Sequence, residues 1–314
     1  PRAHRGRHRR SVLPPARARP PLHRRIRIDC RTGVGSPPRG CLVTSRGNLR
    51  RGDLVGPAVV FVLFLGMWYL VSGILLPPHK RFLLPAPHTV VQEGFLVWRK
   101  GDRRGLQPIL VSLWDSSKVA LTGLSITIVL GVLLALLMST RRWLERATWP
   151  YLVAIQSAPI LALTPLIRAL IEGSTTQRVL VVVLISVFPV VSNTLFGLLS
   201  ADKGQHDLFT LHGAGRMTRL LKLQLPSALP SIFVGLRTAA GLSVIGAVVG
   251  DFYFRGAGVV GIGAQIDVYR QRLWGSELIA SIILASLLGL SVFLVFGWLS
   301  RKLIGRWHEP ERGQ

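Results

Sequence analysis

The chain has 314 residues, of which 49% are hydrophobic, and its 39 lysines and arginines against 14 acidic residues give a net charge of +25. So high an apolar content together with so large a positive charge is unusual for a soluble globular domain. Only two cysteines occur, Cys30 and Cys41, so a disulfide framework and a four-cysteine metal site are excluded.

Residues 1–53 form an arginine- and proline-rich arm that differs in composition from the rest of the chain. The arm holds 15 arginines, no lysine and two acidic residues, with stretches of Arg, Pro, Gly and His. It has little of the apolar periodicity that a folded segment needs, and we therefore expect it to be disordered.

Several interpretations of this arm compete. The first is that it is translated from upstream of the natural start, because the chain begins with Pro1 and the arm has arginine but no lysine. Val43 is then an alternative initiator, and residues 1–42 are absent from the native protein. The second is an arm that faces anionic lipid or sets the topology. Nucleic acid is not an expected partner, because aromatic residues for stacking are absent, and a targeting peptide lacks its long apolar core.

Apolar runs along the rest of the chain predict membrane-spanning helices. A hydrocarbon core of ~30 Å is crossed by ~20 helical residues, and buried helices of soluble proteins rarely stay uncharged for so long. The runs cover residues 54–76, 119–140, 147–167, 179–201, 223–250 and 278–300. Only the fifth contains a charge, Arg237, whose side chain we expect to extend towards the cytoplasmic end of its span. The prediction is an all-α polytopic membrane protein with six transmembrane helices.

The distribution of basic residues predicts the orientation. With a cytoplasmic N-terminus, the basic residues that follow the second, fourth and sixth spans all lie inside, and the tail 301–314 is cytoplasmic as well. The external loop 77–105 disagrees, since it carries six basic residues. We expect this loop to contain an amphipathic helix of its own.

Some polar residues lie within the predicted spans. Arg168 and Glu172 are one helical turn apart near an external end, so we expect them to form an ion pair. For the neutral polar residues, lining a translocation path competes with hydrogen bonding within one helix or between neighbouring helices. The candidates for the path are Gln156, Ser157, Thr164, Asn193 and Ser243.

The segment 202–226, between the fourth and fifth spans, is neither apolar enough to span nor polar enough to be a simple connector. Leu208, Phe209 and Leu211 predict a short helix that stops at the glycines around 213–215. The leucines from 220 to 225 predict a second helix, ended by Pro226. The two helices would form a cytoplasmic knob.

The spacing in this segment resembles the cytoplasmic loop of binding-protein-dependent ABC transporter permeases: Glu-Ala-Ala, three residues, Gly, nine residues, Ile, one residue, Leu-Pro. Gly213 stands at the glycine, Leu223 at the isoleucine, and Leu225-Pro226 at the Leu-Pro. Asp207 replaces the glutamate, and two larger apolar residues replace the alanines. The stretches 84–87, 157–166 and 227–237 are similar to those of the nitrate, sulfonate and taurine branch.

The resemblance implies a coupling loop that contacts a separate ATPase, because this chain has no phosphate-binding Gly-x-x-x-x-Gly-Lys-Ser/Thr motif of its own. The residues expected at that contact are Asp207, Leu208, Leu211, His212, Gly213, Ala214, Arg216, Arg219, Leu225 and Pro226. The family further implies a second permease copy, two ATPase subunits and an extracytoplasmic substrate-binding protein, with membrane lipid around the spans.

The stretch Gly256–Gly261 satisfies a Gly-x-Gly-x-x-Gly pattern, but no βαβ unit surrounds it, so we interpret it as an external turn and expect no cofactor. The charged residues around it form either the polar rim of a docking surface or a solvated loop; they are Asp251, Arg255, Asp267, Arg270 and Arg272. The histidines lack metal-ligand spacing, so no metal site is expected.

We therefore predict a permease subunit of an ABC importer in the bacterial plasma membrane, without catalytic residues, with residues 106–300 as its core and both termini cytoplasmic. One alternative is an intramembrane enzyme, which no Ser-His or paired-carboxylate arrangement supports. The other is a structural membrane anchor, which the loop spacing disfavours. A sulfonate, nitrate, taurine, a pyrimidine or a riboflavin-like solute all remain open as substrate.

Overall fold

The computed structural model of the chain describes residues 51–77, 79, 81–98, 104–256 and 260–304. Residues 1–50 of the basic arm and residues 305–314 of the tail lie outside this part, so the interpretations of the arm remain predictions. The chain divides into the units Pro1–Leu54 and Val55–Gln314. Apart from the first residues of α1, everything that follows concerns the second unit.

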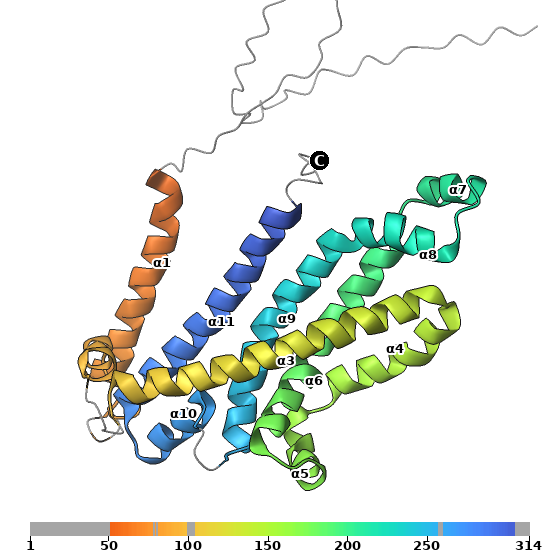
Figure 1. The fold of residues 1–314 in the computed structure, drawn as a ribbon. Helices are drawn as coiled ribbons and strands as arrows, with labels where there is room; N and C mark the ends of the chain where they lie inside the picture. The colour runs from red at the N-terminus through yellow and green to blue at the C-terminus, as the bar shows by residue number, and fades with distance from the viewer. Residues whose placement is uncertain (1–50, 78, 80, 99–103, 257–259, 305–314) are drawn as a thin grey trace, which may run out of the picture. The chain divides into compact units, whose positions relative to one another are not determined.

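The regular elements of the described residues are helices, which confirms the all-α prediction (Figure 1). They are α1 (Arg51–Leu70), α2 (Pro87–Thr89), α3 (Leu106–Thr140), α4 (Arg142–Ser157), α5 (Ile160–Leu170), α6 (Ser174–Leu199), α7 (Lys203–Leu211), α8 (Arg216–Arg219), α9 (Leu225–Tyr253), α10 (Ile262–Gln271) and α11 (Gly275–Ile304). Wider π-helical turns extend three of them, over Val71–Leu75, Val90–Leu96 and Leu220–Gln224. The second of these turns, with α2, supplies the helix expected in loop 77–105.

Among the described residues, five helical segments are long and apolar enough to cross a membrane, and the bent pair α4 and α5 makes a sixth if it is counted as one span. The predicted number of spans is therefore reached only with this pair. The second span starts well before its apolar run, at Leu106 instead of residue 119. Its first turns carry Ser112, Ser116 and Ser117, which are buried against neighbouring elements.

The third span is broken, so the single helix predicted over 147–167 is wrong. The helix axis bends by 102° between α4 and α5. The break lies at Ala158 and Pro159: Ala158 is extended, with φ −67° and ψ 131°, as is usual for a residue before proline. Pro159 has no N–H with which to continue the hydrogen bonds of α4, and its ring would clash with the preceding turn.

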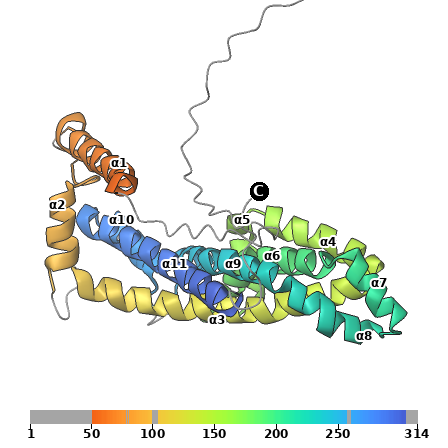
Figure 2. The ribbon, with the colours of Figure 1, turned by 90° about the horizontal axis from the view of Figure 1, so that it is seen from above.

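The centre of the membrane core is the pair α6 and α9. Small residues let their backbones approach: a Cβ added to Gly246 would lie 2.9 Å from the Cα of Val182, and one added to Gly235 would lie 2.7 Å from the carbonyl oxygen of Pro189. α3 packs against α6, and α11 packs against α9. Figure 2 shows α9 between α6 and α11.

Candidate functional site

The loop between α6 and α9 contains the two predicted short helices, α7 and α8. α7 ends in a Schellman motif, in which Gly213 N–H donates to the Thr210 carbonyl (3.0 Å) and Ala214 N–H donates to the Phe209 carbonyl (2.9 Å). Gly213 has φ +65°, in the left-handed region that favours glycine. The glycine singled out by its spacing is therefore the residue that reverses the chain after α7.

Pro226 does not end the second helix, contrary to the prediction. α8 continues through the π-helical turn Leu220–Gln224 into α9, whose first residues are Leu225 and Pro226. In this turn Leu225 N–H donates to the carbonyl five residues earlier, at Leu220, and the wider spacing gives room to the proline ring. Ser227 Oγ donates to the carbonyl of Leu223 at 2.8 Å. As a result α8 is a direct extension of the fifth span.

Eight of the ten predicted coupling residues gather on α7, α8 and the turn between them, at the opposite end of the spans from α5 and α10 (Figure 1), and Leu225 and Pro226 are the first residues of α9. Their apolar members are largely uncovered: Leu211 is 83% exposed and Leu208 is 56% exposed, next to Met217 at 66%. Asp207, His212 and Arg216 are exposed as well. Leu225 instead packs against the core of the spans. The loop thus presents an apolar surface with charged residues around it.

A cavity of about 500 Å³ lies beside the break between α4 and α5. Two of the predicted path residues, Gln156 and Asn193, line it, together with Ser192 and Thr238. Asn193 Nδ2 donates to the Pro189 carbonyl (2.8 Å) and Thr238 Oγ1 to the Val234 carbonyl (3.0 Å). None of the twelve described residues that line it is charged, so its wall offers neutral amide and hydroxyl groups among apolar side chains.

The structure does not bring the other three path candidates into this cavity. Ser243 is fully buried and donates to the Ala240 carbonyl of its own helix at 2.8 Å. Thr164 likewise donates to the Leu161 carbonyl at 2.7 Å. Ser157 is exposed at the last position of α4 but is not among the lining residues. For Ser243 and Thr164 the hydrogen bonds are those of the competing interpretation.

A second, apolar groove of about 690 Å³ lies between α9 and α11. Thr238 and Leu242 line both this groove and the cavity at the break. The two hollows therefore lie on either side of one stripe of α9.

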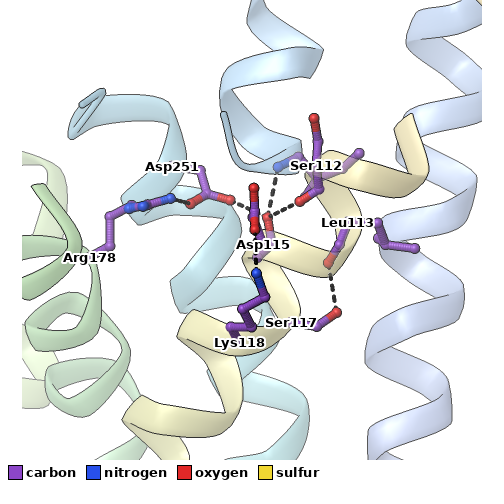
Figure 3. A network of polar contacts seen from close by, with 9 residues as sticks. Ser112, Leu113, Asp115, Ser117, Lys118, Arg178 and Asp251 are labelled. Atoms are coloured by element: carbon purple, nitrogen blue, oxygen red, sulfur yellow. Dashed lines mark hydrogen bonds and ion pairs between the residues drawn. The ribbon is translucent and has the colours of Figure 1, made fainter. Parts of the chain in front are cut away.

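A buried polar network joins four helices near the α10 end of the spans (Figure 3). Arg178 of α6 and Asp251 of α9 form an ion pair, Nη1 to Oδ1 2.8 Å, with side chains only 2% and 0% exposed. Ser116 of α3 donates to the other oxygen of Asp251 at 2.5 Å. The backbone N–H of Ile262, at the start of α10, donates to Ser116 Oγ at 2.7 Å. The network ties the ends of α3, α6, α9 and α10 together.

Sequence reasoning missed this network. The sequence predicted Asp251 either on the rim of a docking surface or in a solvated loop, but it is buried, and a Cβ at Gly261 would lie 2.1 Å from its carboxylate. Asp267 is also buried, paired with Arg255 and, at 2.7 Å, with Arg270. One signal was available: Arg178 and Asp251 are opposite charges directly flanking the runs 179–201 and 223–250.

Two arginines near or within the spans make contacts with aromatic rings, and one of them differs from expectation. Arg168 does not form the expected pair with Glu172; it donates to the Tyr253 carbonyl and lies over the Phe254 ring, 5.9 Å from its centroid. The guanidinium of Arg237 lies 4.0 Å from the centroid of the Phe293 ring on α11. A cation–π contact thus accompanies the charge in the fifth span.

Comparison with known proteins finds membrane components of transport systems. The family model described as "Binding-protein-dependent transport system inner membrane component" matches residues 127–305. A formylaminopyrimidine transport permease of Halalkalibacterium halodurans is 31% identical over 252 residues, covering 79% of this chain and 94% of the relative. A riboflavin transport system permease of Chloroflexus aurantiacus is 30% identical over 257 residues, covering 81% and 90%. A bicarbonate transport permease of Synechocystis is 28% identical over 248 residues, covering 77% and 85%.

Among solved structures, a bacterial ABC transporter involved in the import of the polysaccharide alginate matches with a TM-score of 0.55 and 13% identity. The match covers 80% of this chain and 98% of that chain. At this identity the likeness concerns the fold alone.

Proposed function

The chain belongs to the family of binding-protein-dependent inner membrane transport components, and from this premise we propose how its parts move a solute. It is a non-catalytic, multi-pass inner membrane permease component of an ABC importer of small solutes. The family implies an ATPase and a substrate-binding protein as partners. The assignments below to residues, orientation, copies and solute are proposals.

The loop 202–226 inserts into a cleft of the ATPase. The observation that carries this proposal is the backbone of Gly213, φ +65°, at the family position of the loop. It turns α7 against α8 so that Leu208 and Leu211 stay uncovered, and buried apolar contact is the main source of affinity at such a surface. Because α8 runs without a break into α9, movement of the ATPase reaches the fifth span as movement of one lever.

The solute passes the cavity at the break between α4 and α5, where Gln156 and Asn193 face it. Interrupted spans are typical of solute sites in membrane transporters, because backbone polar groups are freed there. A second copy of this chain encloses the path, giving a homodimer that covers the part of α9 with Thr238 and Leu242, which lies between the two hollows. The coupling loop and both chain termini face the cytoplasm.

The solute is a neutral nitrogen heterocycle rather than an inorganic anion. The uncharged lining of the cavity supports this proposal, since amide side chains both donate to and accept from a heterocyclic edge. Two relatives, 31% and 30% identical, are named for formylaminopyrimidine and riboflavin, and others are named for bicarbonate and nitrate.

The test is uptake by proteoliposomes that contain this chain, its ATPase and its binding protein. We expect ATP-dependent accumulation of a labelled aminopyrimidine or flavin above that of nitrate or bicarbonate. Accumulation of the anions alone would overturn the solute class but keep the importer. Failure of the ATPase to co-purify with the chain would count against the coupling role of the loop.

A further inference from the structure

A separate cavity of about 340 Å³ lies where the end of α3 meets the coupling loop. From α3 and its end it receives Ser139, Thr140 and Arg141, and from the loop it receives His206, Arg216, Met217, Arg219, Leu220 and Gln224. Two segments far apart in the sequence therefore share this cavity, which we call the arginine pocket.

The arginine pocket carries positive charge without a counter-charge. Arg141, Arg216 and Arg219 line it, and none of the described residues that line it is acidic. In the described residues, the ion pairs of the chain involve other cations. Arg219 Nε donates to the Ala214 carbonyl at 3.0 Å. Because this carbonyl is neutral, the charge of the Arg219 guanidinium stays uncompensated. Like charges from two elements repel each other, so the pocket favours an anion between them.

The guanidinium groups indicate the kind of anion. Arginine presents a planar fork of donors that matches phosphate oxygens, and it binds phosphate more specifically than a point charge does. The hydroxyls of Ser139 and Thr140 donate to carbonyls of their own helix at 2.7 Å each. A phosphate group is therefore the chemistry that fits, carried either by a lipid headgroup or by a soluble molecule.

An apolar stripe decides between these two sources. Ile126, Leu130, Leu133 and Leu137 are exposed and follow one another at spacings of three and four residues, so they share one face of α3. This face continues to Thr140 and Arg141, where α3 ends after its membrane-spanning length. Trp143, an exposed aromatic residue typical of the membrane interface, lies two residues after Arg141. A soluble anion would leave the stripe unused, whereas a phospholipid would cover it with an acyl chain.

We propose that the arginine pocket binds the phosphate of an anionic phospholipid and so links the end of α3 to the coupling loop. The headgroup lies between Arg141 on one side and Arg216 and Arg219 on the other, and an acyl chain lies along the stripe from Ile126 to Leu137. This inference goes beyond the proposed transport function. Arg141 is the informative residue, because it lies outside the proposed ATPase contact.

The test compares Arg141→Gln with Arg142→Gln. Arg142 is the next residue, is exposed and does not line the pocket, so it controls for a general change in surface charge. The protein, assembled with its ATPase, is placed in nanodiscs of phosphatidylcholine and phosphatidylglycerol, and native mass spectrometry counts the phosphatidylglycerol that it retains. Since one arginine near an anionic surface is worth ~1 kcal/mol, we expect about fivefold less retained lipid for Arg141→Gln. Arg142→Gln should match the wild type, and Arg141→Lys should recover most of the binding.

Three results would overturn the proposal. Unchanged retention in Arg141→Gln would remove the pocket from lipid binding, and an equal loss in Arg142→Gln would reduce the effect to diffuse attraction. Displacement of the lipid by millimolar inorganic phosphate would assign the pocket to a soluble anion. If Arg141→Gln fails to assemble, a photoactivatable phosphatidylglycerol answers the question in the wild type: cross-links should fall on peptides containing residues 126–141, and their absence there would refute the lipid assignment.

Discussion

Gly213 and Gly215 lie two residues apart in the coupling loop but have different backbones, with φ +65° and φ −66°. A Cβ would meet nothing within 4 Å at either position. A side chain at 213 therefore acts only through the left-handed backbone, which costs an L-residue ~1–2 kcal/mol. We expect Gly213→Val to shift α7 against α8 and to abolish uptake, while the spans still assemble.

Gly215→Val is the matched control, because valine adopts the extended backbone of position 215 without strain. It should transport nearly as well as the wild type. Uptake and co-purification of the ATPase are measured for both variants. Equal uptake by the two would mean that the turn at Gly213 has no part in coupling.

The buried pair Arg178 and Asp251 gives a prediction about stability. Asp251→Asn keeps the shape of the side chain but leaves the Arg178 charge buried without its partner. Removing one member of such a pair typically costs ~3–5 kcal/mol, whereas an exposed pair is worth ~0–1 kcal/mol. Asp115→Asn, which breaks the more exposed pair with Lys118, is the control.

Thermal unfolding in detergent should rank the two variants, with a clear fall in melting temperature for Asp251→Asn and almost none for Asp115→Asn. The double change Arg178→Gln with Asp251→Asn should recover part of the loss, because no charge is then left buried. Similar melting temperatures for the two single variants would contradict the structural role of the network.

Residue patterns predicted only part of these features. Gly213 could be identified because its role is local: spacing along one segment marks the residue that turns the chain. Arg178 and Asp251 belong to different spans, so their pairing depends on how α6 packs on α9 through close contacts such as Gly246 against Val182. The residues around Arg178 and Asp251 do not predict the register in which α6 packs on α9.

At the scale of elements, the break between α4 and α5 can be tested through its proline. Pro159→Ala restores a backbone N–H donor and removes the proline ring, which disfavours a continuous helix by ~3 kcal/mol relative to alanine. α4 should therefore continue towards α5. Gln156 would then turn away from the cavity that it lines with Asn193, and we expect uptake to fall severalfold. Spin labels on α4 and α5 would report directly that the bend between them becomes smaller than 102°.

Pro150→Ala is the control for this change, since Pro150 lies inside α4, which is continuous. Its removal should leave both the break and uptake unchanged. Wild-type uptake in Pro159→Ala would show that the solute does not depend on the bend.

The two prolines 159 and 226 show why elements were predicted less well than spans. Both follow apolar residues, and hydropathy treats them alike. The helix breaks at Pro159, whereas at Pro226 a π-helical turn gives room to the proline ring and the helix continues. Hydropathy also missed the first turns of α3, because buried serines and the Asp115–Lys118 pair lower their apolar content. Apolar runs predict where a helix crosses the membrane but not where it starts, bends or continues.

At the scale of the whole molecule, basic residues at the two ends of the spans are in different states. At the α10 end, three carboxylates hold arginines: Glu277 pairs with Arg104 at 2.8 Å, Asp251 with Arg178, and Asp267 with Arg255 and Arg270. At the end with the coupling loop, the cations in the described residues lack such pairs. The basic loop 77–105, whose charge disagrees with the predicted orientation, therefore has part of that charge paired with Glu277 of α11.

This distribution predicts a coupling loop in the cytoplasm and an exposed loop 77–105 outside. With Cys30 and Cys41 changed to serine, single cysteines replace Thr210 in α7 and Leu96 in the loop, both of which are exposed. A membrane-impermeant maleimide should label Leu96→Cys in intact spheroplasts and Thr210→Cys only after the membrane is opened. Labelling of Thr210→Cys from outside would place α7 where no ATPase is present, and the proposed coupling through Gly213 and α9 would then be impossible.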